Sequence, residues 1–381
     1  MSLNKAQKEA VSHKEGPCLV LAGPGSGKTL TIAKRIEYLI KVYKVRPEEI
    51  LVITFTKYAA WEMKNRTRSI CGPSSYAVTF GTFHGIYYGI LKWAYRLNQS
   101  NLLSDEEKYR ILREILPGID WDQEPEADEE KDYLQELAIE IGNVKNNCMD
   151  IEEYEPVKYT TEKFRKLYRT YEETKKKYRK IDFEDMLIQC RDLFMKRPDI
   201  LKKWQEKFQY ILVDEFQDVN QAQYDVVRML AAPQDNLFVV GDDDQSVYGF
   251  RGAKPGIMKE FMKDYPKARQ ILLDVNYRSS GYIVKGALRV IGNNKIRFEK
   301  KIEAFRKPDE TVHVQEVKDP VQEAEYVLEK IKECQEKGIA YTDWIWYSSG
   351  KSKIRLECGC KGNVRTDDGV SDPVCDERTS E

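Results

Sequence analysis

Short apolar runs alternate with longer amphipathic stretches over the first part of the chain. The runs Cys18–Leu21, Ile50–Thr54 and Ala77–Phe80 have the length and apolar content of buried strands. The stretches between them are typical of helices, as in Leu30–Tyr43, which follows the first run closely. Strands and helices that alternate in this way favour a parallel sheet with flanking helices, so the pattern predicts an α/β fold.

The alternation then stops and later resumes. The intervening segment is charged, rich in tyrosine and helical in pattern, with few strand signals. Apolar runs of strand length return at Tyr210–Val213 and Leu237–Val240. We therefore expect one α/β domain, residues 1–90 and 181–278, that is interrupted by a helical insertion, residues 91–180.

A further unit of the same kind begins toward the end of the chain. Val312–Val317 is predicted to be a strand and Val321–Glu336 an amphipathic helix, so residues 279–343 are expected to be the start of a second α/β domain. Residues 344–381 are polar, with clusters of Ser, Gly and Lys, and only Trp344–Tyr347 hints at another strand. We expect this tail to be disordered or non-native.

Composition narrows the class of protein. The 381 residues are 41% hydrophobic, yet the longest apolar runs have only the length of strands. This predicts a cytoplasmic protein of two or three domains without a membrane span. The eight cysteines are scattered, which is typical of reduced thiols. Because the formal net charge is −1, a nucleic-acid partner has to be argued from local patches.

The strongest chemical signal is a glycine-rich turn directly after the first apolar run. It reads Ala22-Gly23-Pro24-Gly25-Ser26-Gly27-Lys28-Thr29. Backbone N–H groups in such a turn point at phosphate oxygens, and the helix that follows adds its N-terminal dipole. Lys28 would reach the β- and γ-phosphates of a nucleoside triphosphate, and the Thr29 hydroxyl would bind Mg²⁺. Ala22 departs from the usual motif, which has Gly at this position.

Two later apolar runs end in residues suited to phosphate chemistry. Asp214 and Glu215 follow Tyr210–Val213 directly. One carboxylate can hold Mg²⁺ and the other can polarise the attacking water. Three aspartates and Gln245 follow Leu237–Val240 in the same way, and Gln245 could sense a γ-phosphate by hydrogen bonding without titrating. A solvated acidic turn is the alternative interpretation of this second group.

Taken in order, these motifs resemble the superfamily 1 DNA helicases of the UvrD/Rep/PcrA family. The similar elements are Leu3-Asn4 with Gln7, Ala22–Thr29, Thr54–Thr56 with Ala59-Ala60, Gly81–His84, Asp182–Leu187, Val213–Asp218, Gly241–Ala253 and Asn276–Ser279. The resemblance implies a RecA-like domain of the P-loop NTPase type. It also implies ATP hydrolysis coupled to translocation on single-stranded DNA and to unwinding of the 3′→5′ type.

The resemblance also implies roles for single residues. Gln7 would read the adenine, and Tyr277 would stack on it. Glu215 would orient or deprotonate the lytic water beside Asp214 at the metal, and Arg278 would stabilise charge on the transferred phosphoryl group. Contacts to single-stranded DNA are implied for Phe55, Thr56, Phe83, His84, Tyr248, Phe250 and Arg251.

Other interpretations of the DNA-binding candidates stay open. Phe55 and Phe83 are also typical of core aromatics that anchor loops. Lys163–Lys180 holds nine Lys/Arg against two Glu, with aromatic residues between them. That composition suits phosphate contacts, and a solvated helix with its aromatics packed inward has the same pattern. Gln245 would couple the γ-phosphate to DNA by resemblance alone.

The later motifs of the family are not recognisable after Asp343, including the one that supplies a second catalytic arginine. We therefore expect a fragment that binds ATP, single-stranded DNA and duplex junctions, with weak or no DNA-stimulated hydrolysis and no unwinding on its own. Two alternatives are a non-enzymatic nucleotide- and DNA-binding module that acts through a partner, and the ATPase part of a helicase–nuclease.

Overall fold

The protein contains a six-stranded parallel sheet between two layers of helices. The computed structural model describes residues 3–119, 130–246, 253–254, 256–294, 297–307 and 313–338. The chain divides into two compact units, Met1–Thr311 and Val312–Glu381, and the sheet belongs to the first. Its strands are β1 (Cys18–Ala22), β2 (Ile50–Thr54), β3 (Thr79–Thr82), β4 (Tyr210–Val213), β5 (Leu237–Gly241) and β6 (Arg269–Leu273). They lie in the order β3-β2-β4-β5-β1-β6.

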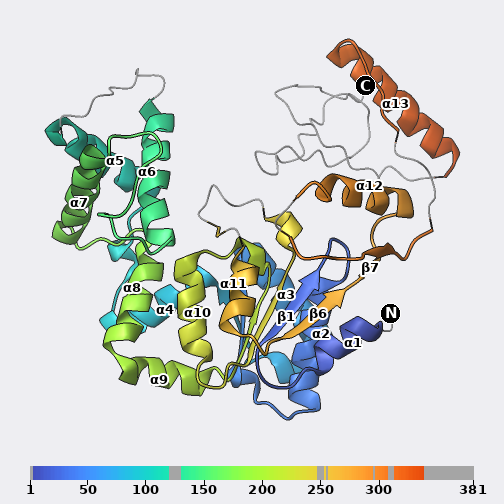
Figure 1. Ribbon diagram of the computed structural model, residues 1–381, viewed down its shortest axis with the longest axis horizontal. Helices are drawn as coiled ribbons and strands as arrows, with labels where there is room; N and C mark the ends of the chain where they lie inside the picture. Colours follow the sequence, from blue (N-terminus) through green and yellow to red (C-terminus); the bar gives the residue numbers. More distant parts are fainter. Residues whose placement is uncertain are drawn as a thin grey trace, which may run out of the picture. The chain divides into compact units, whose positions relative to one another are not determined.

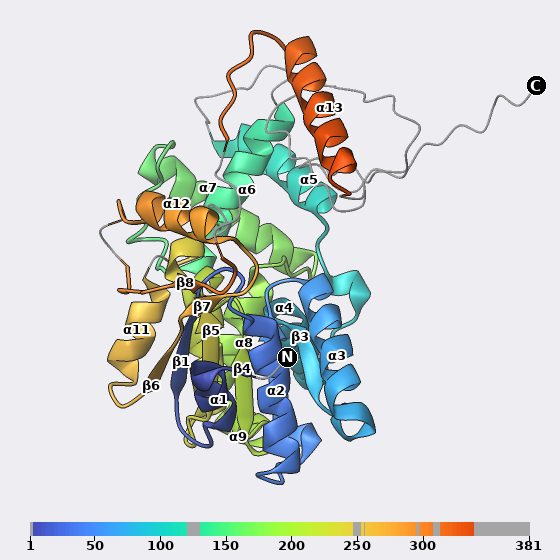
Figure 2. The same cartoon turned by 90° about the vertical axis from the view of Figure 1, so that its right-hand side faces the viewer.

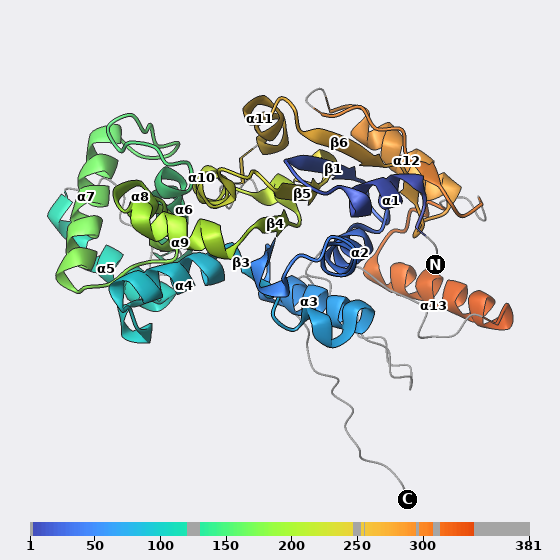
Figure 3. The same ribbon diagram turned by 90° about the horizontal axis from the view of Figure 1, so that it is seen from below.

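Helices cover both faces of this sheet (Figure 3). One layer consists of α1 (Lys5–Ser12), α2 (Lys28–Lys41) and α3 (Lys57–Cys71), and α1 and α2 lie over the strands in Figure 2. The other layer consists of α4 (Phe83–Tyr95), α8 (Asp185–Lys196), α9 (Pro198–Lys207), α10 (Gln221–Ala231) and α11 (Ile257–Asp264). The α/β fold predicted from the alternation is therefore confirmed.

The strands are buried on both faces, which explains why they appear as continuous apolar runs. In β1, Leu19 and Leu21 belong to the core under α4 and α8, whereas Cys18 and Val20 belong to the core under α2. Successive side chains of a strand point to opposite faces, so one short run supplies both cores. The carboxyl ends of β1, β2, β4 and β5 meet at one edge of the sheet because all their pairings are parallel.

The predicted insertion has a hydrophobic core of its own. It contains α5 (Asp105–Ile115), α6 (Glu130–Asn146) and α7 (Thr161–Lys177), which form a group beside the sheet in Figure 1. Leu112, Leu137 and Leu167 are among its fully buried residues. The expected boundary after residue 90 falls inside α4, whose Ile90 and Leu91 pack in the core of the main sheet.

After β6 the chain forms a second, two-stranded sheet, in which β7 (Val275–Asn276) pairs with β8 (Glu303–Ala304). The helix α12 (Gly281–Ile291) lies between these two strands in the sequence. In the second unit, α13 (Pro320–Glu336) confirms the predicted helix, and the Asp319 side chain caps it by accepting a hydrogen bond from the Val321 backbone N–H at 2.9 Å. In the described ranges, no helix combines the length and the apolar character needed to cross a membrane.

Two strand predictions need correction, and one strand of the main sheet was missed. The third strand begins at Thr79 instead of Ala77, because its pairing with β2 starts at that residue. The strand predicted at Val312–Val317 is wrong, since residues 313–317 have no regular secondary structure, and Val312 lies outside the described residues. The sequence pattern also missed β6, an edge strand whose first two residues are exposed and polar. The strand hint at Trp344–Tyr347 lies outside the described residues.

Candidate active site

The glycine-rich turn joins β1 to α2 at the carboxyl edge of the sheet. Ala22 ends β1, and α2 begins at Lys28 after a left-handed Gly27 with a φ of 85°. The backbone angle favours glycine here, and a Cβ atom would lie 2.9 Å from the Gln7 Nε2 atom, so the Gln7 side chain would have to shift. Gly25 is also left-handed, with a φ of 67°. The turn therefore directs the first N–H groups of α2 outward from the sheet, where they suit an anion.

Hydrogen bonds from α1 and from the segment after β7 hold this turn. Gln7 Nε2 donates to the Ser26 carbonyl oxygen at 3.0 Å, and the Tyr277 N–H donates to the Gly25 carbonyl oxygen at 2.9 Å. Asn4 joins the two segments, because its Nδ2 donates to the Tyr277 hydroxyl at 3.0 Å. Gln7 and Tyr277 are thus brought together beside the turn, although they are far apart in sequence.

The predicted acids face the turn from the end of β4. Lys28 Nζ donates to Glu215 Oε2 at 2.8 Å. Glu215 has a φ of 50°, a left-handed conformation that is uncommon for this residue type and typical of functional sites. Asp214 is 7% exposed. Burial, and secondarily the charge of Glu215, raise the pKa of Asp214 to about 7.

Gln217 connects these acids to the loop after β5, a role that the sequence pattern did not reveal. Its Nε2 donates to Glu215 Oε2 at 2.9 Å, and its Oε1 accepts the Asp242 N–H at 3.0 Å. Gln245 Nε2 in turn donates to Asp242 Oδ2 at 2.6 Å. The ends of β4 and β5 therefore form one hydrogen-bonded unit around Glu215.

Two adjoining cavities lie over these residues. One, of about 370 Å³, is lined by Pro24, Gly25, Ser26, Gly27, Lys28, Thr29, Arg66, Glu215, Gln245, Tyr277 and Arg278. The other, of about 380 Å³, contains Asp214 and shares Thr29, Glu215 and Gln245 with the first. The structure thus brings together most of the residues predicted to bind nucleotide, whereas Gln7 lies behind the turn.

A larger groove of about 750 Å³ adjoins the second cavity. Phe55 and Thr56, which follow β2, line both of them. Within the groove the rings of His84 and Phe183 stack with their centroids 3.6 Å apart, and Phe183 is 53% exposed. Burial lowers the pKa of His84 to about 3, so its imidazole is neutral at pH 7 and offers a ring face without charge.

Phe83 also lines this groove, but its side chain is 2% exposed and packs edge-on against Tyr87 in the main core. It anchors α4, as the alternative interpretation of this residue proposed, and its ring does not offer a stacking surface. Phe183 offers one instead. The sequence signal for it was its place in Asp182–Leu187. Tyr248, Phe250 and Arg251 lie outside the described residues.

The neutral state of His84 predicts a pH dependence of stability. Its pKa falls from 6.5 to about 3 on folding, so its contribution to stability is fully present above pH 6.5. This contribution is lost toward pH 3 by about 1.4 kcal/mol per pH unit. His84→Gln should remove it. We expect the free energy of unfolding of the unchanged protein, measured in urea, to fall more steeply than that of the variant between these pH values. Parallel curves would contradict this expectation.

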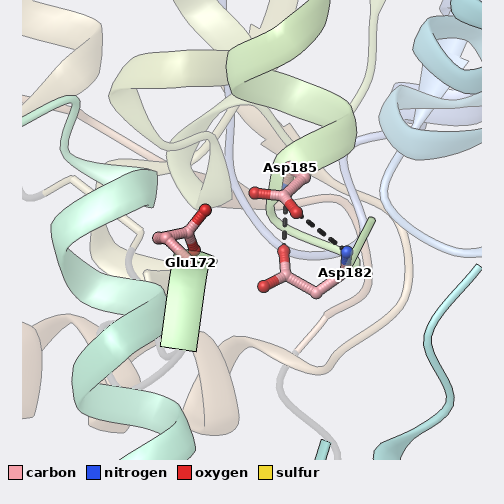
Figure 4. A group of neighbouring side chains, drawn as sticks. All are labelled: Glu172, Asp182 and Asp185. Atoms are coloured by element: carbon pink, nitrogen blue, oxygen red, sulfur yellow. Dashed lines mark hydrogen bonds between the residues drawn. The ribbon is translucent and has the colours of Figure 1, made fainter. Parts of the chain in front are cut away.

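A second acidic group lies where the insertion joins the main domain. Glu172, Asp182 and Asp185 approach one another closely enough to hold a cation (Figure 4). Two lysine ammonium groups already fill this space: Lys145 Nζ lies 2.6 Å from Asp182 Oδ2, and Lys175 Nζ lies 2.8 Å from the same oxygen. The cluster is therefore a buried ion network.

The basic stretch of the insertion is partly explained by the same packing. Phe164 and Tyr171 are fully buried within the insertion, and Lys175 is 1% exposed. Two interpretations were left open for Lys163–Lys180. Phe164 and Tyr171 agree with the one in which the aromatic side chains of a solvated helix pack inward.

Two family models match this chain. The family model described as the UvrD/REP helicase N-terminal domain matches residues 3–266, and that of the UvrD-like helicase C-terminal domain matches residues 271–356. The chain is 39% identical over 355 residues to the putative ATP-dependent DNA helicase YjcD of Bacillus subtilis, covering 90% of this chain and 45% of the relative. It is 35% identical to ATP-dependent DNA helicase PcrA of Staphylococcus aureus, covering 95% of this chain and 50% of PcrA. With DNA helicase II of Escherichia coli the identity is 34%, over 93% of this chain and 50% of the relative. The chain thus spans about half the length of these curated relatives.

Proposed function

This chain belongs to the UvrD/REP helicase family, and we propose that it binds ATP at the turn after β1 and hydrolyses it in response to single-stranded DNA. One observation carries the coupling. Phe55 and Thr56 line both the cavity that contains Glu215 and the aromatic groove. A ligand in the groove therefore touches the same short segment that bounds the nucleotide cavity.

The chemistry assigned to the nucleotide cavity is attack of water on the γ-phosphate. Lys28 and the N–H groups of the turn hold the phosphates. Glu215 orients the water and accepts its proton. Gln245 lies within the same cavity and recognises the γ-phosphate, while Arg278 offsets charge that develops on the transferred group.

The adjoining cavity, which contains Asp214, suits Mg²⁺. The Thr29 hydroxyl and the Asp214 carboxylate both line it, and oxygen donors of these two kinds are the ligands that Mg²⁺ prefers. A cation there would favour the charged form of Asp214, whose pKa burial raises to about 7. When bound, the ion would neutralise charge on the β- and γ-phosphates.

The groove suits single-stranded DNA because exposed aromatic rings stack on bases of any sequence. Family membership extends the proposal to translocation of the 3′→5′ type and to duplex junctions as substrates. The names of the relatives, ATP-dependent DNA helicase and DNA helicase II, support the same activity.

The proposal is tested by ATP turnover of this chain in Mg²⁺, with and without oligo(dT), followed by unwinding of a 3′-tailed duplex. Weak turnover that rises with oligo(dT) and disappears in Lys28→Ala is the expected result, in keeping with the low activity expected from the sequence. Binding of ATP and DNA without turnover would contradict the proposal and favour a non-enzymatic module that acts through a partner.

Phe183→Ala should weaken binding of oligo(dT). Loss of one base-stacking surface costs about 1–3 kcal/mol, which is roughly a 5- to 150-fold increase in Kd. Fluorescence anisotropy of labelled oligo(dT) measures this change. Tyr95→Ala is the matched control. Tyr95 is also 53% exposed, but it is the last residue of α4 and does not line the groove. Equal affinities of the two variants would remove Phe183 from the proposed DNA site.

A further inference from the structure

The three aspartates after β5 are held by a cation from a much later segment of the chain. Lys300 Nζ lies 2.6 Å from Asp243 Oδ1 and 2.7 Å from Asp244 Oδ2, and it also contacts Asp242 Oδ1. The Lys300 side chain is fully buried. Arg297 Nη2 adds a second contact to Asp244 Oδ2 at 2.7 Å.

These contacts show whether the acidic group is free to bind a metal ion. In the described part of the chain, Asp242, Asp243 and Asp244 form one of two acidic groups compact enough to hold a metal ion. An ammonium group occupies that position, so the charge of the acids is offset from within the protein. The alternative interpretation of a solvated acidic turn also fails, because Asp242 is 1% exposed.

Asp242 divides its two carboxylate oxygens between the later segment and the nucleotide cavity. Oδ1 accepts from Lys300, and Oδ2 accepts from Gln245 Nε2 at 2.6 Å. A carboxylate with both oxygens engaged has little rotational freedom about its side-chain bonds. Oδ1 also accepts the Asp244 N–H at 3.3 Å, so Lys300 and this N–H together hold Asp242, and Asp242 in turn orients Gln245.

We propose that Lys300 is a positioning residue of the nucleotide site, which fixes Asp242 so that the Gln245 amide faces the γ-phosphate. The inference rests on the proposed function and extends it. Lys300 lies within the match to the C-terminal family domain, whereas Asp242 and Gln245 lie within the match to the N-terminal one. Recognition of the γ-phosphate thus depends on a residue outside the domain that contains the phosphate-binding turn.

Loss of Lys300 should weaken the binding only of nucleotides that carry a γ-phosphate. Lys300→Met leaves three neighbouring carboxylates without their buried cation, so Asp242 turns or takes a proton and no longer holds Gln245. Because ADP lacks the group that Gln245 recognises, its affinity should change little. The ratio of the Kd for ADP to the Kd for a slowly hydrolysed ATP analogue should fall by about 3- to 10-fold, the value of one hydrogen bond.

The test measures both affinities by competition with a fluorescent nucleotide for the unchanged protein, Lys300→Met, Gln245→Ala and the double variant. Each single variant should lower the ratio, and the double variant should lower it no further, because both changes break one link. Lys300→Arg should restore part of the preference. Lys301→Met, a change at an exposed neighbour, is the matched control and should keep it.

Several outcomes would overturn the inference. An unchanged ratio in Lys300→Met, or effects of the two variants that add, would show that Lys300 does not act through Gln245. If Lys300→Met fails to fold by thermal unfolding, Asp242→Asn breaks the same link with a group of the same size and must give the same loss. If the unchanged protein binds no nucleotide, the proposed function fails together with the inference. If a Lys300 variant binds nucleotide with the original preference, only the inference fails.

Discussion

Glu215→Gln is expected to lower ATP turnover by about 10²–10⁴-fold while leaving the affinity for ATP almost unchanged. The amide keeps the size of the side chain and can still accept from Lys28, whose Nζ lies 2.8 Å from Glu215 Oε2. It cannot take a proton from water at neutral pH. Steady-state turnover in Mg²⁺, together with binding of a slowly hydrolysed ATP analogue, separates the two effects.

Glu37→Gln is the matched control for this change. Glu37 lies on α2, the helix that begins with Lys28, and it also pairs with lysine, its Oε2 atom lying 2.9 Å from Lys34 Nζ. It does not line either nucleotide cavity. Its replacement should leave turnover unaltered. Turnover by Glu215→Gln that equals that of this control would exclude Glu215 as the base.

Lys175→Met is expected to destabilise the protein by about 3–5 kcal/mol, because it leaves buried carboxylates without one of their two cations. Lys175 Nζ contacts Asp182 Oδ2 and Glu172 Oε1, each at 2.8 Å. Burial alone would raise the pKa of Asp182, but the charges of Lys145 and Lys175 outweigh burial and hold that pKa well below its usual range. Urea unfolding followed by circular dichroism measures the loss.

Two further variants show whether the loss comes from charge. Lys177→Met removes an exposed lysine from the end of the same helix and should change the free energy of unfolding by less than about 0.5 kcal/mol. Adding Asp185→Asn to Lys175→Met removes one of the unpaired carboxylates and should recover part of the stability. If Lys175→Met and Lys177→Met unfold alike, the buried network contributes nothing to stability.

The sequence predicted those parts of the fold whose pattern is local. The strands β1, β2 and β4 were recognisable because each is an apolar run buried on both faces. The turn at Gly25 and Gly27 was recognisable because its glycine-rich sequence is typical of phosphate-binding loops. β6 was not recognisable, since an edge strand with exposed polar residues looks like a loop. Its place is fixed by pairing with β1, a contact between residues about 250 positions apart that no local pattern contains.

The same distinction applies to the site. Lys28, Thr29, Asp214 and Glu215 were predicted because each stands directly after a strand, where parallel topology brings side chains to one edge. Lys300 and Gln217 were missed because they act through hydrogen bonds to Asp243 and Asp242, which lie far from them in the sequence and are brought near only by tertiary packing. Phe83 was assigned to DNA on the strength of a motif, and only its burial shows that it is a core residue.

The strand order has a consequence for how the protein is made. β1 and β2 follow each other in the sequence but are separated in the sheet by β4 and β5. A nascent chain that has left the ribosome only as far as the insertion therefore carries the phosphate-binding turn without the strands on either side of β1. Gly25 gains its bond from Tyr277 later still. ATP stabilises only a state that binds it, so ATP bound as proposed can contribute to folding only after β5, β6 and Tyr277 have been synthesised.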